Sequence, residues 1–335
     1  MRVLVTGATG FIGLNLLAAL DGTDHDPVAM VRPAASTARL PDGVDTVEGD
    51  LSDPDSLAAA MAGGEGGGDE ADGGDKADDA DRGDGGGGTD GVDAVVHLAA
   101  AVYDAAAMAH TNAAGTERLV EAAGEAGIDR FVFLSTIGAH PEVPADADST
   151  YQQSKVASEG LLFGRDHPFE VSAVYPTYIF GPRDYRLTRY EHVRPVAANR
   201  VLVPPLYTDA KYNVVHVDDV TGTVVACLDG DASGRQLVTG PNLTNRQVLR
   251  CIARHAPGNC RVVSVPYGVI RWGVKPAMDL LHRVGVSPVP GDGFLERGDF
   301  GTVDPDLAER APVDQRSWED AIGETIEWYE RVGIL

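Results

Sequence analysis

Tyr151 and Lys155 form a Tyr-x-x-x-Lys pair within the segment YQQSK. On a helix, a spacing of four residues places both side chains on one face. A free tyrosine ionises near pH ~10, and an ammonium group one turn away favours the phenolate and so lowers that pKa. Tyr151 could then give or take a proton at a substrate C–O group. The same spacing usually marks a surface pair, but a chain with only four lysines forms such pairs less often by chance.

Three glycines follow the apolar segment RVLVT with G-x-x-G-x-x-G spacing. Glycines let the backbone turn tightly and approach a pyrophosphate closely, and the next helix N-terminus supplies free N–H groups and a positive dipole end. We therefore expect a dinucleotide at this turn; the alternative is a glycine-rich turn without a ligand. The residues of the turn expected at the dinucleotide are Gly7, Thr9, Gly10, Phe11, Ile12 and Gly13.

Arg32 directly follows the second predicted strand, and no acidic residue occurs between positions 33 and 38. An acidic residue there would bind the ribose 2′-OH of NAD, whereas arginine can pair with the 2′-phosphate of NADP and stack on adenine. We expect NADP as the preferred coenzyme and NAD as the second; otherwise Arg32 is a solvated surface residue. Asp50 and Leu51 are expected at the adenine, unless Asp50 only caps the helix that starts at Asp53.

Ser135 and Thr136 end the predicted strand RFVFLS. Ligands bind at the carboxyl ends of strands in parallel α/β sheets. A hydroxyl here can orient the substrate oxygen toward Tyr151, with Thr136 as the first choice and Ser135 as the second. The alternative is a pair of hydroxyls that only close the strand end.

Strands and helices alternate along the first half of the chain, as buried apolar runs and amphipathic segments. The alternation predicts an α/β fold of the Rossmann type, a doubly wound parallel sheet with right-handed crossovers. Residues 1–179 are expected to form the dinucleotide-binding domain and 180–335 mainly a substrate-binding part, with 213–240 returning to the first domain. The expected strands are 2–6, 27–31, 44–48, 92–98, 130–135 and 170–175, and the expected helices are 11–20, 53–61, 110–126 and 153–165; a strand, turn and helix are expected over 214–228 and a last helix over 317–332.

Residues 63–91 interrupt this pattern, because 13 of the 29 are glycine and 10 are acidic. Such a segment cannot bury enough apolar surface to offset its ordering entropy. We expect a disordered acidic loop, either a tolerated insertion or a regulatory or cation-binding segment.

The chain of 335 residues carries 51 acidic and 27 basic residues, a formal net charge of -24. A surface this negative repels phosphate backbones and anionic lipid heads, so neither nucleic acid nor membrane is an expected partner. Few lysines and many acids are typical of halophilic, haloarchaeal cytosols, where molar salt screens self-repulsion. The alternative is a high-GC genome with one acidic insertion.

Three cysteines without CxxC spacing suggest buried, reduced thiols and a cytoplasmic location. The N-terminus lacks the apolar region of a signal peptide, and no apolar run is long enough to span a membrane. The nine histidines show no metal-ligand spacing, so we expect no metal.

The chain resembles the extended short-chain dehydrogenase/reductases, the NAD-dependent epimerase/dehydratase superfamily. The family pattern is matched in order, over residues 1 to about 225, by TGATGFIG, GDLSD, VVHLAA, NAAGTERLVEAA, FVFLST, YQQSK, YPTYIFGPRD and VVHVDDV. The ending EDAIGETIEWYERVG also matches. The VRP after the second strand resembles the branch of dihydroflavonol reductases and 3β-hydroxysteroid dehydrogenases.

The resemblance implies that Tyr151 is the acid/base, Lys155 its helper and Thr136 the hydroxyl partner. It places Tyr151 and Lys155 also against the coenzyme. It adds further coenzyme contacts at Leu98, Ala99, Ala100, Asn112, Pro176, Tyr178 and Ile179. For Asn112 the alternative is a helix-surface amide. Tyr175 departs from the family, where an arginine often precedes the proline, and this leaves the substrate class open.

The resemblance favours an NAD(P)-dependent oxidoreductase that moves a hydride between nicotinamide and a small carbonyl or carbinol substrate. The first alternative is a nucleotide-sugar epimerase or dehydratase with tightly bound NAD. The second is a non-catalytic NADPH-binding regulator or accessory subunit. Relatives often form homodimers through the helices corresponding to 110–126 and 153–165, which makes a homodimer the arrangement to test.

Overall fold

The computed structural model describes residues 1–63, 91–102, 104, 108–143, 149–185, 193–198, 201–202, 211–263, 267–284, 302–308 and 317–335. Most of the predicted acidic loop, 64–90, lies outside these ranges. The chain divides into two compact units. The first comprises Met1–Phe133 with Ser154–Val171, and the second Leu134–Gln153 with Ser172–Leu335. The expected domain boundary at residue 179 stays a prediction.

The first part of the chain alternates strands and helices as expected. Its elements are β1 (Arg2–Thr6), α1 (Phe11–Leu20), β2 (Asp26–Val31), β3 (Asp45–Glu48), α2 (Pro54–Met61), β4 (Ala94–His97), the π-helical η1 (Ala109–Ala114), α4 (Gly115–Ala126), β5 (Arg130–Leu134), the 3₁₀ turn η2 (Ile137–Ala139), α5 (Thr150–Phe163) and β6 (Glu170–Pro176).

The remaining elements are shorter and less regular. They are β7 (Tyr178–Phe180), α6 (Val193–Ala198), β8 (Val201–Leu202), β9 (Lys211–His216), α7 (Val217–Asp229), β10 (Gly234–Val238), β11 (Asn242–Thr244), α8 (Asn245–His255), β12 (Arg261–Val262), α9 (Tyr267–Val269), the π-helical η3 (Ile270–Val274), α10 (Lys275–Arg283), α11 (Pro305–Ala308) and α12 (Trp318–Arg331).

Seven strands form one sheet in the order β10-β6-β5-β4-β1-β2-β3. The pairs β1–β2, β1–β4, β2–β3, β4–β5 and β6–β10 are parallel. Parallel neighbours with helical crossovers, and an order that reverses direction at β1, make this a doubly wound Rossmann-type sheet. The predicted fold class is confirmed.

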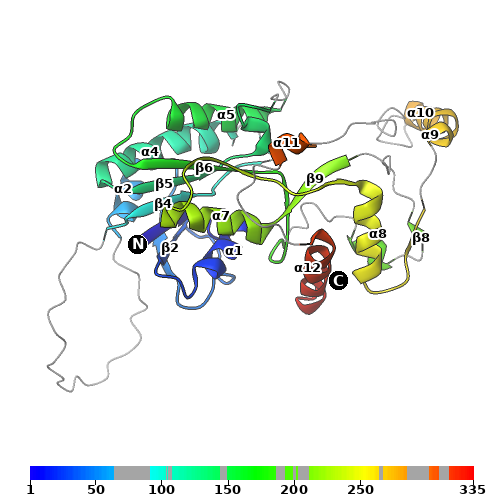
Figure 1. The fold of residues 1–335 in the computed structure, drawn as a ribbon, viewed down its shortest axis with the longest axis horizontal. Helices are drawn as coiled ribbons and strands as arrows, with labels where there is room; N and C mark the ends of the chain where they lie inside the picture. Colours follow the sequence, from blue (N-terminus) through cyan, green and yellow to red (C-terminus); the bar gives the residue numbers. More distant parts are fainter. Residues whose placement is uncertain are drawn as a thin grey trace, which may run out of the picture. The chain divides into compact units, whose positions relative to one another are not determined.

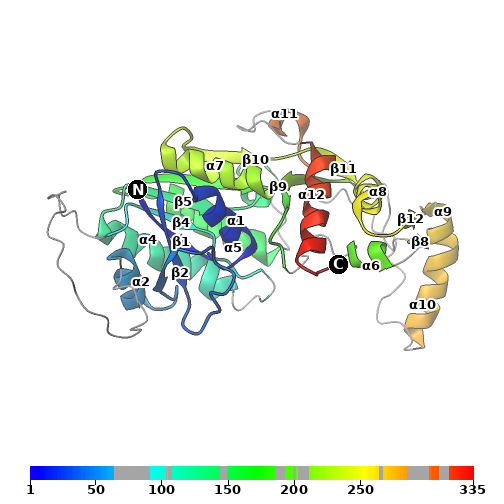
Figure 2. The ribbon, with the colours of Figure 1, turned by 90° about the horizontal axis from the view of Figure 1, so that it is seen from below.

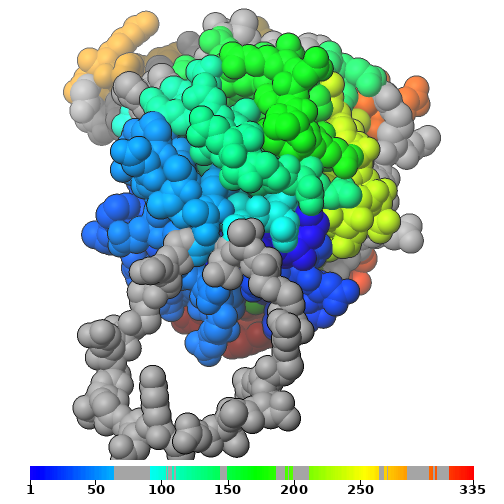
Figure 3. Space-filling view, turned by 90° about the vertical axis from the view of Figure 1, so that its left-hand side faces the viewer, coloured from blue at the N-terminus to red at the C-terminus, as the bar shows by residue number. Residues whose placement is uncertain are grey.

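Apolar residues explain the core of the first unit. Every residue of β4 is buried, and so are Leu16, Leu17 and Leu20 of α1. Helices α4 and α5 lie on one face of β4 and β5, and α1 lies on the other (Figure 1). On the surface, α2, α4 and α5 are neighbours, coloured from light blue to green (Figure 3). Asp53 caps α2 and Pro54 is its first residue, as the sequence predicts.

Two predicted helices differ from the structure at their first turns. The helix expected over 110–126 begins with the π-helical turn η1, and only Gly115–Ala126 is α-helical. The helix expected from residue 153 instead begins at Thr150. Its cap is Ser149, whose Oγ accepts the Gln152 N–H at 3.3 Å. An overlooked serine N-cap therefore explains the earlier start.

The second unit has its own core, built around a three-stranded sheet in the order β11-β9-β7. Helices α8 and α12 lie beside one another (Figures 1 and 2), and their apolar residues meet in one buried cluster. A capping box of Thr244 and Gln247 begins α8. The predicted last helix is confirmed as α12. Among the helices of the described ranges, none has the length and apolarity to cross a bilayer.

Candidate functional site

The turn between β1 and α1 is sterically restricted to glycine at two positions. Gly7 has φ +71°, and a Cβ there would lie 2.8 Å from the Ala99 nitrogen. A Cβ on Gly13 would lie 2.6 Å from the Ala8 Cα. At exposed Gly10 a Cβ would meet only the Gly7 oxygen, at 3.1 Å, so the space outside Gly10 is open to a ligand. Gly7 and Gly13 thus allow a tight turn, and the surface of this turn at Gly10 has space for a ligand.

The N-terminus of α1 is open to an anion. Gly10 is its N-cap, and no side chain caps the first turn. The first N–H groups of a helix lack intrahelical partners and lie at the positive end of its dipole. Thr9, Phe11 and Ile12 are each half-buried around this turn. The described residues therefore fit a dinucleotide pyrophosphate, as the sequence predicts.

Arg32 and Asp50 follow neighbouring strands, and Arg32 is exposed. The Asp50 carboxylate accepts the Ser52 N–H at 2.8 Å and the Ser52 hydroxyl at 2.6 Å. These bonds, helped by the charge of Arg32, hold the pKa of Asp50 below its ordinary value. The alternative that Asp50 caps α2 is wrong, because Asp53 accepts the Asp55 N–H at 3.1 Å. Leu51 is buried.

Asn112 is not a surface amide, because only 2% of it is exposed. It lies in the π-turn η1, a class of distortion frequent at functional sites. Its Nδ2 donates to the Ala101 carbonyl at 2.9 Å, and its Oδ1 accepts the Ala101 N–H at 2.8 Å. Nδ2 also lies 2.9 Å from the Ser154 hydroxyl. Asn112 thus fixes the backbone that directly follows Leu98, Ala99 and Ala100.

Lys155 is buried, with only 2% of its surface exposed. Its Nζ lies 4.5 Å from the centroid of the Phe133 ring. Burial lowers the pKa of Lys155 to about 7, and the Glu159 carboxylate one turn on partly opposes this shift. Burial therefore disfavours the ammonium expected from the sequence, and an anionic ligand nearby would favour it again.

A buried polar chain that sequence reasoning missed lies beside these residues. His97 Nδ1 is 2.7 Å from the Thr6 hydroxyl, and His97 Nε2 is 3.0 Å from the Thr116 hydroxyl. The Thr116 hydroxyl donates to the Asn112 carbonyl. The signal in the sequence was a histidine that ends an otherwise apolar strand, just before the predicted Leu98.

The predicted acid/base and hydroxyl residues lie in the second unit. Tyr151 is half-buried in the first turn of α5, the helix that also carries Lys155. Ser135 is buried, and its N–H donates to the Val174 carbonyl at 2.8 Å. Thr136 is half-buried and its backbone is extended, with φ -148°. Accessibility therefore favours Thr136 over Ser135 as the hydroxyl partner.

Strand β6 ends at buried Pro176, and the chain bends at Thr177. Tyr178 and Ile179 of β7 are half-buried, and β7 pairs with β9 in parallel. Thr177 donates its hydroxyl to Asn213 Oδ1 at 2.8 Å. Tyr175, the departure from the family pattern, is fully buried with its ring edge-on to His140 at 4.8 Å between centroids. This tyrosine is therefore a buried residue of β6, without access to a substrate.

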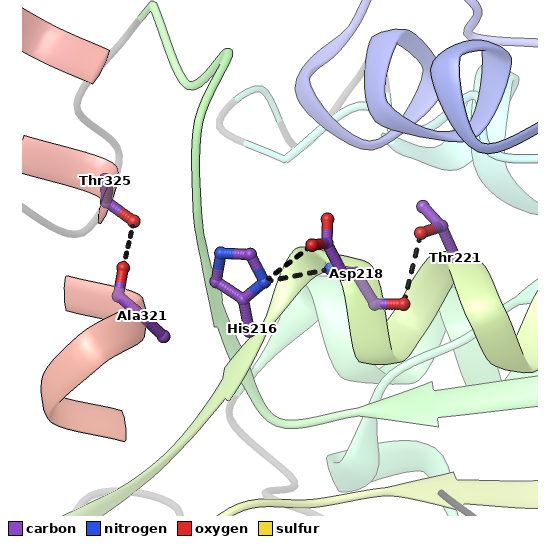
Figure 4. A network of polar contacts seen from close by, with 5 residues as sticks. All are labelled: His216, Asp218, Thr221, Ala321 and Thr325. Atoms are coloured by element: carbon purple, nitrogen blue, oxygen red, sulfur yellow. Dashed lines mark hydrogen bonds and ion pairs between the residues drawn. The ribbon is translucent and has the colours of Figure 1, made fainter. Parts of the chain in front are cut away.

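The motif VVHVDDV contributes structure rather than accessible chemistry. His216 ends β9, and its Nδ1 accepts the Asp218 N–H at 3.3 Å in the first turn of α7 (Figure 4). Phe180, Val214, His216, Gly240 and Trp318 line a small pocket beside it.

Within the first unit, hydrogen bonds join the glycine turn, the loop after β4 and Asn112. Thr136, Tyr151 and residues 176–179 belong to the second unit, and their meeting with the first set stays a prediction. Among the described residues, no group of three or more His, Cys, Asp or Glu side chains is arranged to hold a metal ion.

Comparison with known proteins gives matches along most of the chain. Residues 79–240 match the model of the NAD dependent epimerase/dehydratase family, and residues 7–66 match an NAD(P)H-binding family model. A dTDP-glucose 4,6-dehydratase of Streptomyces niveus is 26% identical over 98% of this chain and 93% of its own. A putative dihydroflavonol 4-reductase of Synechocystis is 25% identical over 99% of this chain and 95% of its own.

Among solved structures, the UDP-glucose 4-epimerase of Thermus thermophilus in complex with NAD has a similar fold. The TM-score is 0.67 at 22% identity, over 98% of this chain and 99% of that one.

Proposed function

The chain belongs to the NAD-dependent epimerase/dehydratase family of enzymes, and from that premise we propose that it is an NAD(P)-dependent oxidoreductase acting on a small carbonyl or carbinol substrate. Bound NAD(P) supplies a nicotinamide carbon that takes up or gives a hydride. The first unit would hold the coenzyme: the turn at Gly10 its pyrophosphate, Leu51 and Asp50 its adenine, and Leu98–Ala100 its adenosine ribose.

Tyr151 would transfer the proton at the substrate oxygen. The observation that carries this role is the shared helix: α5 begins at Thr150, so half-buried Tyr151 and buried Lys155 are separated by one helical turn. An ammonium at Lys155 would favour the Tyr151 phenolate. Thr136 would orient the substrate oxygen, and Pro176, Tyr178 and Ile179 would flank the nicotinamide.

NADP would be the preferred coenzyme. Support comes from exposed Arg32 at the end of β2, where a guanidinium can pair with a 2′-phosphate. The 2′-hydroxyl of NAD would lack this charge pair.

The second candidate is a nucleotide-sugar dehydratase or epimerase with tightly bound NAD, favoured by the similarity to the Streptomyces niveus dehydratase. Such an enzyme returns the hydride to its substrate, so it shows no net turnover of coenzyme. A non-catalytic NADPH-binding regulator is less well supported, because the chain keeps both Tyr151 and Lys155.

The test is purification followed by release and identification of bound nucleotide, and then a screen of aldehydes, ketones, steroid-like alcohols and nucleotide-sugars. We expect an exchangeable NADP and a substrate-dependent change in NADPH absorbance that Tyr151→Phe abolishes. Stoichiometric, non-exchangeable NAD with no net turnover would support the dehydratase instead. Unchanged turnover in Tyr151→Phe would contradict the proposed acid/base.

A further inference from the structure

His97 sits in a hydrogen-bond chain whose direction can be worked out atom by atom. The Thr116 hydroxyl has one hydrogen, and it donates this hydrogen to the Asn112 carbonyl, which can only accept. The contact of 3.0 Å between Thr116 Oγ1 and His97 Nε2 therefore requires the imidazole to donate. Nε2 thus carries the hydrogen.

The other ring nitrogen then accepts. In a neutral imidazole with hydrogen on Nε2, Nδ1 is the acceptor. The Thr6 hydroxyl donates to it across 2.7 Å while its oxygen accepts the Ala99 N–H at 3.2 Å. A protonated imidazole carries a hydrogen on Nδ1 as well, so the Thr6 hydroxyl would have to accept that hydrogen. The hydroxyl hydrogen of Thr6 would then lose Nδ1 as its acceptor.

The surroundings of His97 also oppose its protonation. Only 1% of His97 is exposed. The centroid of its ring lies 6.2 Å from that of the Phe131 ring and 5.7 Å from that of the Phe133 ring. The groups facing it are hydroxyls from β1 and α4, aromatic rings from β5, and the Lys155 amine from α5, which Glu159 partly balances. Burial and the charge of Lys155 lower the pKa of His97 to about 3.

The chain joins the parts of the first unit that are expected to touch the coenzyme. Thr6 directly precedes Gly7, and Ala99 packs against Gly7. On the other side, Thr116 bonds to the carbonyl of Asn112, whose side chain fixes Ala101. The Ser158 hydroxyl also donates to that carbonyl, at 2.9 Å. One imidazole thus links β1, the loop after β4 and the π-turn.

We propose that His97 is a positioning residue of the coenzyme site, which as a neutral Nε2–H imidazole holds the glycine turn and the Leu98–Ala101 loop in the geometry that binds the dinucleotide. This role rests on the proposed function. His97 does not contact the coenzyme or the reacting atoms; it acts through Thr6 and Thr116.

The first test is ¹⁵N NMR of the histidine rings, with the His97 signals identified by their absence from His97→Asn or their shift in Thr116→Val. At pH 6 we expect a neutral ring with its hydrogen on Nε2. An imidazolium, or a hydrogen on Nδ1, would overturn the proposal. This readout needs neither substrate nor coenzyme, so it is separate from the proposed function.

The second test is the dissociation constant of NADP and NAD, measured by calorimetry, together with kinetics at saturating coenzyme. His97→Asn and Thr116→Val should each weaken coenzyme binding by about tenfold. His97→Asn removes the Nε2 donor, and Thr116→Val removes the hydroxyl that joins His97 to the Asn112 carbonyl. The double variant should be no weaker than the worse single variant, because the two residues act as one unit. The KM for coenzyme should rise while kcat changes by less than about twofold.

His167→Asn is the matched control. His167 is half-buried, stacks on Phe169, which in turn stacks on Phe131, and contacts the Leu161 carbonyl at 3.1 Å instead of the hydroxyls of Thr6 and Thr116. We expect it to bind coenzyme like the unaltered protein. If His97→Asn lowers the melting temperature but leaves the dissociation constant unchanged, His97 is only structural and the proposal is wrong. If the unaltered protein binds neither coenzyme, the proposed function fails and this proposal fails with it.

Discussion

Asn112 bonds to both main-chain groups of Ala101, donating to its carbonyl at 2.9 Å and accepting its N–H at 2.8 Å. Asn112→Asp keeps the shape but removes the donor and buries a carboxylate. We expect it to lower the free energy of unfolding by about 1–3 kcal/mol. Urea unfolding measures this, and Asn259→Asp at an exposed position should have nearly no effect. Equal stability of the two variants would contradict the assigned hydrogen bonds.

Gly13 and Gly160 offer a matched pair of Gly→Ala substitutions. A Cβ at Gly13 would lie 2.6 Å from the Ala8 Cα, a backbone atom that cannot move without distorting the turn. We expect Gly13→Ala to abolish coenzyme binding. Gly160 lies within α5 and a Cβ there meets nothing within 4 Å, so Gly160→Ala should stabilise by about 0.5–1 kcal/mol. Coenzyme binding by Gly13→Ala at the unaltered affinity would show that the turn is not the pyrophosphate site.

Arg32 is expected to select NADP. Arg32→Ala should lower kcat/KM for NADPH by at least about tenfold and leave kcat/KM for NADH nearly unchanged, because only NADPH carries the 2′-phosphate. Arg235→Ala, another exposed arginine, should change neither value. The difference should shrink in molar KCl, since salt screens exposed charge pairs. Equal kcat/KM values for the two coenzymes before substitution would rule the assignment out.

The burial of Lys155 predicts a particular pH dependence of stability. Its pKa in the folded state is about 7, against 10.5 ordinarily. Between pH 7 and pH 10.5, Lys155 of the unfolded chain is protonated and Lys155 of the folded chain is not. The free energy of unfolding therefore rises with pH in this range, by at most about 1.4 kcal/mol per pH unit. Below pH 7 Lys155 is protonated in both states, so the free energy of unfolding no longer gains from its deprotonation.

Lys155→Met tests this dependence, because methionine fills similar space without a charge. We expect the variant to be more stable at pH 7, to lose the rise between pH 7 and 10, and to lose activity. Chemical denaturation across this pH range measures the slope. An unchanged slope would mean that Lys155 is not the buried titrating group.

The sequence predicted those structural elements whose residue types favour a single conformation. Gly7 and Gly13 are required by close backbone contacts. Short β-branched apolar runs bounded by glycine, such as RVLVT, favour buried strands, so the Rossmann-type fold could be predicted. Asp53 with Pro54 marked the start of α2 for the same reason.

The parts that were missed depend on contacts between distant segments. His97 bonds to Thr6 and Thr116, which lie 91 and 19 residues away in the chain, and no local pattern shows such pairs. The π-turn around Asn112 cannot be distinguished from an α-helix by composition. The early start of α5 depends on the Ser149 hydroxyl, which accepts the Gln152 N–H at 3.3 Å.

The decisive measurement is a crystal structure with bound NADP. We expect the pyrophosphate at the turn around Gly10, with the Tyr151 hydroxyl and the Lys155 amine both within hydrogen-bond reach, about 3 Å, of the nicotinamide ribose or the adjacent substrate oxygen. A coenzyme bound elsewhere, or a Tyr151 directed away from the nicotinamide, would contradict it.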